Sequence, residues 1–467
     1  MGGKVLSRRQ LFYGTAVAAG AGLFLSACAP AQTPAPKATA TEAPQPTPVA
    51  PEVGKIEYYS YDLGPANQSR EAIRDAFQQA NPGVEVTLTF LPYGECWDKM
   101  AALMAAGTPP DVIYGDFSML RYALEGELLD LTPYFEADPD LSKPELFTVD
   151  MRDPIQAKYG TTRIFNLILG TWVPVLFYNM EIFDEAGEPY PNEDWTWDDF
   201  RAVAKKLTDP SKPQWGGQWG TVLDEVGWMW WLHKPEDFWA VPQAYPEKTV
   251  FDSPTGISVL KHWYDLGFVD GSMVPFAEQG GYGAFGGAFG AGRVAMDIGG
   301  DWDAGWGYRD LPFKWGVTFL PMVEKGYRPN LNCMWATNQI AAKSKNHKLA
   351  WEFARFMSVT KEGQLAIGQG AYETPVLKEA AHADAVMKPE WAPPGYEVRV
   401  KAAELAGPSY CPYPLCLNLW EFPSKYLDPT VEQLTKGELT PEQAAKYLDE
   451  QGTPYYQQLR KETPSLP

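Results

Sequence analysis

The sequence contains few cysteines and histidines, the side chains from which structural zinc sites are built. Its 467 residues include 5 cysteines and 4 histidines, and no two cysteines are spaced as a CxxC pair. The histidines lie far apart, at positions 233, 262, 347 and 382. Structural zinc sites are built from closely spaced pairs of these residues. The sequence therefore predicts no metal site, and no motif in it calls for a cofactor.

Basic residues are also scarce relative to acidic ones. The chain carries 39 lysines and arginines against 59 aspartates and glutamates, which gives a formal net charge of -20 at pH 7. A polyanion of this size is repelled by nucleic acid and by anionic lipid. The composition argues against a nucleic-acid partner, and the excess of acidic side chains favours solubility.

Long apolar runs are missing except near the N-terminus. Residues 13–27 are apolar, but this run is shorter than the roughly 20 residues that a membrane-spanning helix needs. Before it, residues 7–12 (SRRQLF) resemble a twin-arginine export signal, and residues 25–28 (LSAC) resemble a lipobox, in which Cys28 becomes lipidated. We predict a signal peptide over residues 1–27 and membrane attachment through a lipid on Cys28 alone. The alternative is a plain signal peptide.

Proline, alanine and threonine dominate the segment that follows. Residues 28–54 contain almost nothing that could be buried in a core, so we expect a disordered tether between the anchor and a folded body. The folded body would lie outside the cytosol, where disulfides are permitted. The sequence leaves open how its cysteines pair, at positions 96, 333, 411 and 416.

Strand and helix patterns alternate after residue 54. The pattern predicts strands over 55–61, 83–92 and 109–116, with helices over 67–80 and 96–107 between them. Such an order is typical of βαβ units, an α/β fold and a parallel sheet. Ligands meet such sheets at the carboxyl ends of the strands. The loops at these ends begin at Tyr61 and Asp62, near Tyr93, and at Gly115 and Asp116, and we take Tyr61, Asp62 and Asp116 as site candidates.

The rest of the chain continues this mixture of helices and strands. Thr196 and Asp199 have the spacing of a capping box that opens a helix. Strands are predicted over 294–302 and 314–321, one long helix over 345–367, and a C-terminal helix over 439–459 with Thr440 as its N-cap and Pro441 in its first turn.

Several motifs in this order resemble a known family. They are NPGVEVTLTF (81–90), GELLDLTPYF (126–135), VLFYNMEIFDEAG (175–187), GRVAMDIGGDW (292–302) and SKNHKLAWEFARFMSVTKEGQ (344–364). Together they resemble the extracellular solute-binding proteins of ABC importers, in the sugar-binding group that includes maltose-binding protein. The resemblance implies a type II periplasmic-binding-protein-like fold, with two α/β lobes joined by three chain crossings. It places these crossings near 172–175, 314–319 and 360–364. Lobe one would comprise 55–172 with 316–361, and lobe two 173–315 with 362–467.

The resemblance also implies a function. The protein would capture a carbohydrate, a mono- or oligosaccharide, between its lobes and deliver it to the permease subunits of the importer. It would act as a monomer without enzymatic activity, as a membrane-anchored lipoprotein at the cell surface or in the periplasm. Two alternatives stay open: a secreted glycoside hydrolase, and the same fold binding another solute, such as a glycerol phosphate ester or a peptide. No basic residue occurs in the strand-end loops, which weighs against a phosphate.

A sugar site needs flat aromatic rings for the apolar faces of a pyranose and polar side chains for its hydroxyl groups. The resemblance places Trp302 after a strand as a stacking ring with Asp301 beside it, and Trp172 at the first crossing. Its other candidates are Trp335, Tyr372 and Glu373.

A tryptophan-rich stretch, residues 224–240, supplies further candidates. If its middle is helical, as in the family, Trp228 and Trp231 share one face whereas Trp230 points to the other side. We predict that Trp228 and Trp231 face the ligand and that Glu225 bonds a hydroxyl group.

Overall fold

The computed structural model describes residues 53–115, 119–152, 162–219, 248–275, 278, 286–328, 334–405 and 421–462. The chain divides into two units, residues 1–50 and residues 51–467, and every described residue belongs to the second. The predictions for the signal peptide, for Cys28 and for most of the tether therefore lie outside the described residues. No helix in the described part of the chain is both long and apolar enough to cross a membrane.

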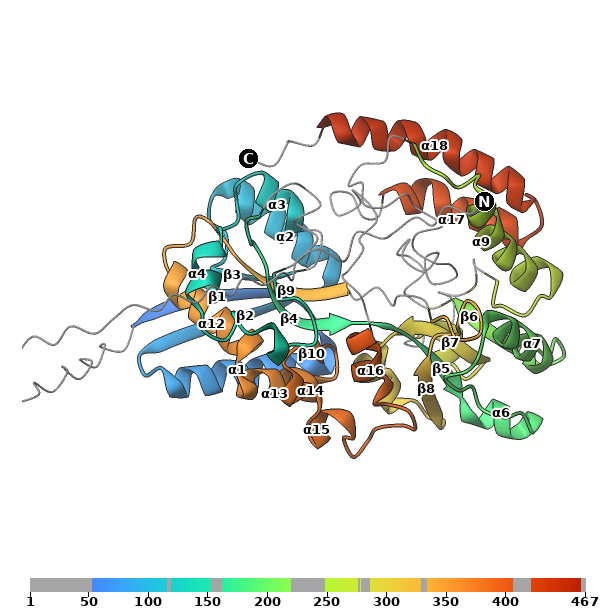
Figure 1. Cartoon of the computed structure of the whole chain (residues 1–467), viewed down its shortest axis with the longest axis horizontal. Helices are drawn as coiled ribbons and strands as arrows, with labels where there is room; N and C mark the ends of the chain where they lie inside the picture. The colour runs from blue at the N-terminus through green and yellow to red at the C-terminus, as the bar shows by residue number, and fades with distance from the viewer. Residues whose placement is uncertain are drawn as a thin grey trace, which may run out of the picture. The chain divides into compact units, whose positions relative to one another are not determined.

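A six-stranded mixed sheet forms the first half of the fold (Figure 1). In spatial order its strands are β10 (Thr374–Pro375), β4 (Leu167–Trp172), β9 (Met334–Ile340), β3 (Val112–Gly115), β1 (Gly54–Tyr61) and β2 (Val84–Leu91). Strand β1 pairs in parallel with both β2 and β3. Helix α1 (Asn67–Ala80) connects β1 to β2, and helix α2 (Tyr93–Ala106) connects β2 to β3. The predicted βαβ units are therefore confirmed. The remaining pairs are antiparallel.

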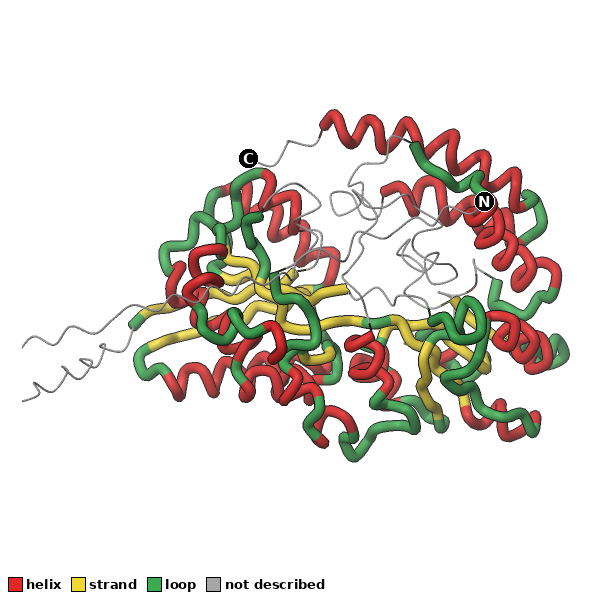
Figure 2. Tube along the Cα trace, in the orientation of Figure 1, coloured by secondary structure: helices red, strands yellow, loops and turns green. Residues whose placement is uncertain are grey.

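A four-stranded sheet forms the second half (Figure 2). Its strands are β6 (Trp215–Trp219), β7 (Val294–Gly300), β5 (Pro174–Asn179) and β8 (Trp315–Phe319), in this spatial order. Helix α7 (Trp197–Leu207) packs against β6 and β7. It begins with the predicted capping box, in which the backbone N–H of Thr196 donates to Asp199 and that of Asp199 to the Thr196 hydroxyl. Helices α9 (Pro254–Tyr264), α17 (Asp428–Thr435) and α18 (Pro441–Glu462) pack on one another.

The chain passes between the sheets at positions that agree only in part with the expected ones. Strands β4 and β5 are separated by Val173 alone, inside the expected first crossing. Residues 315–319 form β8, which pairs with β5, so the second passage comes after Phe319 rather than at 314–319. The chain also stays with the first sheet through β10, because Thr374 pairs with Thr171. The third passage therefore lies after Pro375 and not at 360–364.

The single helix expected over residues 345–367 is two helices. These are α12 (His347–Val359) and α13 (Lys361–Gly370). Thr360 between them has an extended backbone, and its hydroxyl accepts a hydrogen bond from the Gly363 N–H at 3.1 Å. The side chain thus caps α13, as threonine does at helix starts. The apolar period continues across the break because both helices cover the same sheet, with α12 packed on β4 and β9 and α13 on β4 and β10.

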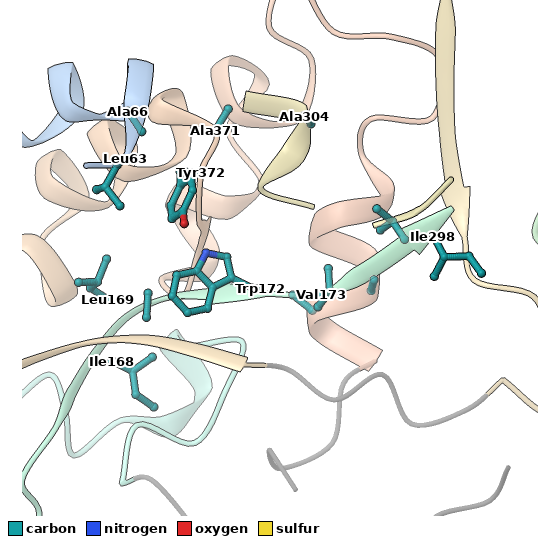
Figure 3. Packing of buried hydrophobic residues seen from close by; sticks show 14 of the residues in the cluster. Leu63, Ala66, Ile168, Leu169, Trp172, Val173, Ile298, Ala304, Ala371 and Tyr372 are labelled. Atoms are coloured by element: carbon teal, nitrogen blue, oxygen red, sulfur yellow. The ribbon is translucent and has the colours of Figure 1, made fainter. Parts of the chain in front are cut away.

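Buried apolar side chains from both sheets form one continuous core (Figure 3). Strands β4 and β5 are buried along their whole length, as is typical of strands covered on both faces. Figure 3 shows Trp172 and Val173 near the passage between these strands, with Tyr372 close to Trp172 and Ile298 beyond Val173. The core is thus continuous where the chain passes from one sheet to the other.

One carboxyl group is buried within the four-stranded sheet without a nearby cation. Asp297 on β7 accepts hydrogen bonds from the Tyr308 hydroxyl at 2.5 Å and from Gln218 Nε2 at 3.1 Å. Burial raises the pKa of Asp297 to about 7, and the two hydrogen bonds only partly oppose this effect. The folded protein therefore binds this proton more tightly than the unfolded chain.

We expect Asp297→Asn to change the pH dependence of stability. The Asp297 contribution is fully present below about pH 4 and is lost as the pH rises through about 7. Relative to the variant, the wild type should lose at most about 1.4 kcal/mol per pH unit over this window. Urea unfolding of both proteins between pH 4 and pH 8 measures the difference. If the free energies of unfolding of wild type and variant changed in parallel with pH, the raised pKa of Asp297 would be contradicted.

Candidate functional site

Four of the predicted site residues meet where strands of both sheets end. Tyr61 ends β1, Trp172 ends β4, Trp302 follows β7 and Tyr372 precedes β10. The ring of Trp172 lies 6.0 Å from that of Trp302 and 6.0 Å from that of Tyr372, between ring centroids. Tyr372 also contacts Tyr61, at 6.5 Å. The structure thus brings together side chains that are far apart in the sequence.

Four aromatic residues that the sequence reasoning missed join this group. Tyr114 lies between Tyr61 and Trp172, at centroid distances of 5.3 and 6.4 Å. The other three additions extend the group outward: Tyr93 contacts Tyr61 at 5.0 Å, Trp97 contacts Tyr61 at 6.1 Å, and Trp306 contacts Tyr372 at 6.1 Å. We call the eight residues the aromatic cluster: Tyr61, Tyr93, Trp97, Tyr114, Trp172, Trp302, Trp306 and Tyr372.

The sequence held a weak signal for these missed residues. Tyr93 and Trp97 are one helical turn apart in α2, and Trp306 is one turn after Trp302. One-turn spacing places two rings on the same helix face. Tyr114 gave no such signal, because it lies inside a short buried strand.

The aromatic cluster has a buried base and an exposed rim. Its base consists of Tyr61, Tyr114, Trp172 and Tyr372, which are all buried. Trp97 and Trp302 are half-buried, whereas Tyr93 and Trp306 are 43% and 37% exposed. The rim can therefore present ring surface to a ligand while the base holds it in place.

Two glycines make room for the rim tryptophans. Trp302 precedes the short helix α11 (Asp303–Trp306), and its ring lies over the backbone of Gly300. A Cβ atom on Gly300 would come within 2.2 Å of that ring. Gly64, in the turn η1 (Gly64–Ala66), has a φ of +59°, and a Cβ atom there would lie 2.5 Å from the Trp306 ring. A larger residue at either position would displace a tryptophan.

Asp301, the residue before Trp302, connects the two sheets by hydrogen bonds. It is completely buried, and its Oδ1 accepts a hydrogen bond from the Val173 N–H at 2.9 Å. Its Oδ2 accepts from the Thr374 hydroxyl at 2.8 Å and from Arg399 Nε at 3.1 Å. Burial raises the pKa of Asp301, and the charge of Arg399 on α16 (Val398–Leu405) opposes this effect. In this structure both oxygens of Asp301 bond to protein groups, so the residue supports the site from behind.

Glu373 is likewise held inside the protein. It forms a completely buried ion pair with Arg70 of α1 and accepts a hydrogen bond from the Tyr114 hydroxyl at 2.5 Å. Its second oxygen, Oε2, has no hydrogen-bond partner among the described residues, and the same holds for the indole Nε1 of Trp172. These two polar atoms are buried at the base of the aromatic cluster.

Asp62 is the exposed carboxylate among the predicted residues that the structure describes. Its Oδ1 accepts hydrogen bonds from the Gly64 N–H at 2.8 Å and from Asn67 Nδ2 at 2.7 Å. Asp62 therefore stabilises the turn before α1, and because the residue is exposed its carboxylate can also accept a hydrogen bond from a ligand hydroxyl group.

A comparison with protein families identifies the chain. The model for the bacterial extracellular solute-binding proteins matches residues 64–364. The chain belongs to this family. The matched segment includes all of the aromatic cluster except Tyr61 and Tyr372.

Relatives of the solute-binding protein have known structures and names. The galactooligosaccharide-binding protein of Bacillus subtilis is 23% identical over 350 residues, covering 71% of this chain and 75% of that protein. An ABC substrate-binding protein from Listeria monocytogenes, solved with cycloalternan, matches with a TM-score of 0.69 and 23% identity, over 85% of this chain and 98% of that one. The cyclic alpha-maltosyl-1,6-maltose binding protein of Arthrobacter globiformis matches with a TM-score of 0.67 and 19% identity, over 87% of this chain and 100% of that one. These likenesses confirm the expected two-lobe α/β fold.

Several predictions for the solute-binding protein lie outside its described residues. These are Asp116, Glu225, Trp228 and Trp231. Of Trp335 only the backbone is described, and it pairs with Thr171 in the first sheet.

The described part of the solute-binding protein holds no group of three or more histidine, cysteine, aspartate or glutamate side chains that could bind a metal. Its Cys96 is buried as a free thiol, and burial raises the pKa of this thiol to about 11. The other four cysteines lie outside the described residues.

Proposed function

We propose that the protein captures a carbohydrate at the aromatic cluster and delivers it to the permease of an ABC importer. The observation that carries this proposal is a set of aromatic rings with a buried base and an exposed rim. Pyranose rings have apolar C–H faces that pack on aromatic side chains. Three relatives support the ligand class: two are named for galactooligosaccharide and cyclic maltosyl-maltose, and the third was solved in complex with cycloalternan.

The charges around the aromatic cluster favour a neutral ligand. Arg70 and Arg399 lie next to it, and each is buried in an ion pair with a carboxylate of this chain. A phosphate ester would require a cation available for charge-assisted hydrogen bonds. The two arginines do not supply one, which favours a sugar over a glycerol phosphate ester.

The proposed mechanism is ligand-stabilised closure of the two lobes. Trp302 follows a strand of the four-stranded sheet, whereas Tyr61 ends a strand of the six-stranded sheet and Tyr372 precedes another of its strands. A sugar that contacts rings of both groups would stabilise the state in which they lie together. The closed state would then dock on the permease.

The proposed ligand contacts come from two sets of residues. Among described residues they are Asp62 and Trp302 directly, with Tyr61, Trp172 and Tyr372 lining the site from its buried base and Asp301 and Glu373 supporting them from within. Asp116, Glu225, Trp228, Trp231 and Trp335 remain predicted contacts. We further propose that the protein is an exported monomer, held at the outer face of the membrane by a lipid on Cys28.

A thermal-shift screen of the mature chain tests the function. Ligands that bind only the folded state raise the melting temperature. We expect a rise with mono- or oligosaccharides at millimolar concentration and none with glycerol phosphate or peptides. The reverse pattern would refute the proposal. Release of new reducing ends from an oligosaccharide would instead indicate a glycoside hydrolase.

Replacing Trp302 with alanine should weaken sugar binding by roughly tenfold or more, because burying an aromatic face contributes about 1.5 kcal/mol or more. Isothermal titration calorimetry with the sugar found in the screen measures the change. Trp391→Ala is a matched control, since Trp391 is also half-buried but packs on Tyr396 and Arg309, outside the aromatic cluster. Equal affinities of the two variants would exclude Trp302 from the site.

A further inference from the structure

One short segment, residues 301–310, carries both rim tryptophans. Trp302 lies just before the short helix α11, and Trp306 is the last residue of that helix. The turn η8 (Tyr308–Asp310) follows. Helical elements this short are not stable by themselves. The orientation of both rings therefore depends on how the segment is bonded to the four-stranded sheet.

Three aspartates connect this segment to the rest of the fold. Asp301 begins it, with the hydrogen bonds described above. Asp303 is buried in α11, and its Oδ2 accepts a hydrogen bond from the Gly300 N–H at 3.2 Å. At the other end of the segment, the Tyr308 hydroxyl donates to Asp297 on β7. The rim tryptophans lie between these attachments, so loosening either end would let their rings move.

The ring of Tyr308 is held as firmly as its hydroxyl group. It contacts Phe177 of β5 at 4.8 Å and Phe289 at 5.1 Å, between ring centroids. Gly286 has a φ of +74°, and a Cβ atom there would come within 2.4 Å of the Tyr308 ring. The hydroxyl group cannot turn away from Asp297 without disturbing these contacts. A change of charge at Asp297 therefore acts directly on the residue that anchors the end of the segment.

The groups that bond Asp297 are neutral. Gln218 on β6 donates to its Oδ1 at 3.1 Å, and the same amide is fixed by two backbone hydrogen bonds. Tyr308 is the titratable group that faces Asp297. Burial raises the pKa of Tyr308, and the charges of Asp297 and Asp303 raise it further. The phenol therefore stays protonated and remains a hydrogen-bond donor.

Among the described residues, neighbouring elements bring no positive charge to Asp297. Helix α10 (Gly287–Gly290) contains no charged residue, and Arg309 in η8 is exposed. Helices α6 (Met180–Ala186) and α7 also pack on β7, but no described charged side chain on either helix acts on Asp297. Below about pH 7 the carboxyl group is therefore neutral. Above this pH, the fold must hold a buried negative charge without a cation, which is costly.

We propose that the Asp297–Tyr308 pair positions the two rim tryptophans, so that sugar binding is strongest when the Asp297 carboxyl group is protonated. Ionisation places an uncompensated charge behind the segment and favours its hydration over the buried contacts. The Tyr308 end then loosens, and Trp302 and Trp306 lose their fixed orientation. A ring that must be ordered on binding contributes less to affinity than one already held in place. This inference rests on the proposed function and adds a dependence on pH to it.

Calorimetric titration at pH 6, 7 and 8, with the sugar found in the screen, tests the proposal. The wild-type affinity should fall about threefold or more between pH 6 and pH 8, and at most about tenfold per pH unit because one group ionises. By reciprocity, the sugar raises the proton affinity of Asp297. At pH 7 binding should therefore take up part of a proton, seen as an enthalpy that differs between phosphate and Tris buffers. Asp297→Asn stays neutral, so its affinity should not change with pH and it should take up no proton.

Tyr308→Phe distinguishes positioning from a purely structural role. The Tyr308 hydroxyl lowers the pKa of Asp297, so its removal should weaken binding and also move the midpoint of the pH dependence to higher pH. Tyr190→Phe is the matched control, because Tyr190 donates to the carboxylate of Asp184 at 2.5 Å, on α6. This control should bind and respond to pH as the wild type does, and melting temperatures at each pH show that the variants are folded.

Two results would overturn the inference and leave the proposed function standing. One is a wild-type affinity that stays constant from pH 6 to pH 8. The other is a pH dependence that persists unchanged in Asp297→Asn, which would assign it to other groups. If the wild type binds no sugar at any pH, the proposed function fails instead.

Discussion

Replacement of Arg70 with methionine is expected to lower the free energy of unfolding by about 3 to 5 kcal/mol, the usual cost of leaving one charge of a buried ion pair without its partner. Arg70 and Glu373 both have side chains that are 0% exposed, and the pair joins α1 to the segment before β10. Without the guanidinium group, the Tyr114 hydroxyl would be the one hydrogen-bond donor left to the Glu373 carboxylate among the described residues. Urea unfolding of the mature chain measures the loss.

Two further variants make this prediction specific. Removing the second charge as well, in Arg70→Met with Glu373→Gln, should recover a large part of the lost stability. Lys55→Met breaks the exposed ion pair with Glu85, and it should cost less than about 1 kcal/mol. A small loss in Arg70→Met, or a double variant no more stable than the single one, would show that the buried pair is not the source of the stability.

Arg399→Met should have an effect of similar size and should also affect ligand binding. It removes the cation that bonds Asp301, and we expect a loss of about 3 to 5 kcal/mol from the unpaired buried carboxylate. Asp301 lies directly before Trp302 and bonds to Thr374 of the other sheet. Loss of Arg399 therefore loosens the turn that carries the proposed stacking ring, and sugar affinity should fall together with stability.

The difference in sugar affinity between Arg399→Met and Arg70→Met is the critical test of this second prediction. Both variants break a completely or almost completely buried ion pair, yet only Arg399 bonds to the residue before Trp302. At a temperature where both variants remain folded, calorimetry should show weaker sugar binding in Arg399→Met than in Arg70→Met. Equal affinities would mean that the turn keeps its position without the ion pair. Thr374→Val removes one hydroxyl hydrogen bond to the Asp301 carboxylate and should cost about 1.5 to 3 kcal/mol.

The sequence allowed the local structure and part of the site to be predicted. The βαβ order and the capping box at Thr196 follow from periodicity and short-range chemistry, and both are present in the structure. Trp172 and Trp302 were placed by the order of family motifs, and their rings do meet. Helix α12 ends at Val359 because the hydroxyl group of Thr360 caps the next helix, a detail that the continuous apolar period conceals.

The ion-pair partners, the strand order and the later chain passages depend on contacts between distant parts of the chain. Glu373 was predicted from its position in a loop, but its partner Arg70 is 303 residues away in the sequence. Asp301 and Arg399 are separated by 98 residues. Tyr114 joins the aromatic cluster because β3 lies beside β1 in the sheet. Strand order and ion-pair partners of this kind leave no periodic trace in one sequence, and the second and third chain passages were misplaced for the same reason.

The bonds of Asp301 also bear on how the molecule can move. Its two oxygens hold the Val173 N–H, the Thr374 hydroxyl and the Arg399 guanidinium at once. The first connection between the sheets, at Val173 between β4 and β5, is therefore held rigid, because rotation of the backbone there would break several buried hydrogen bonds together. We expect the bending that accompanies opening to concentrate in the other two connections, after β8 and after β10. The β4–β5 connection would then act as the fixed axis of this motion.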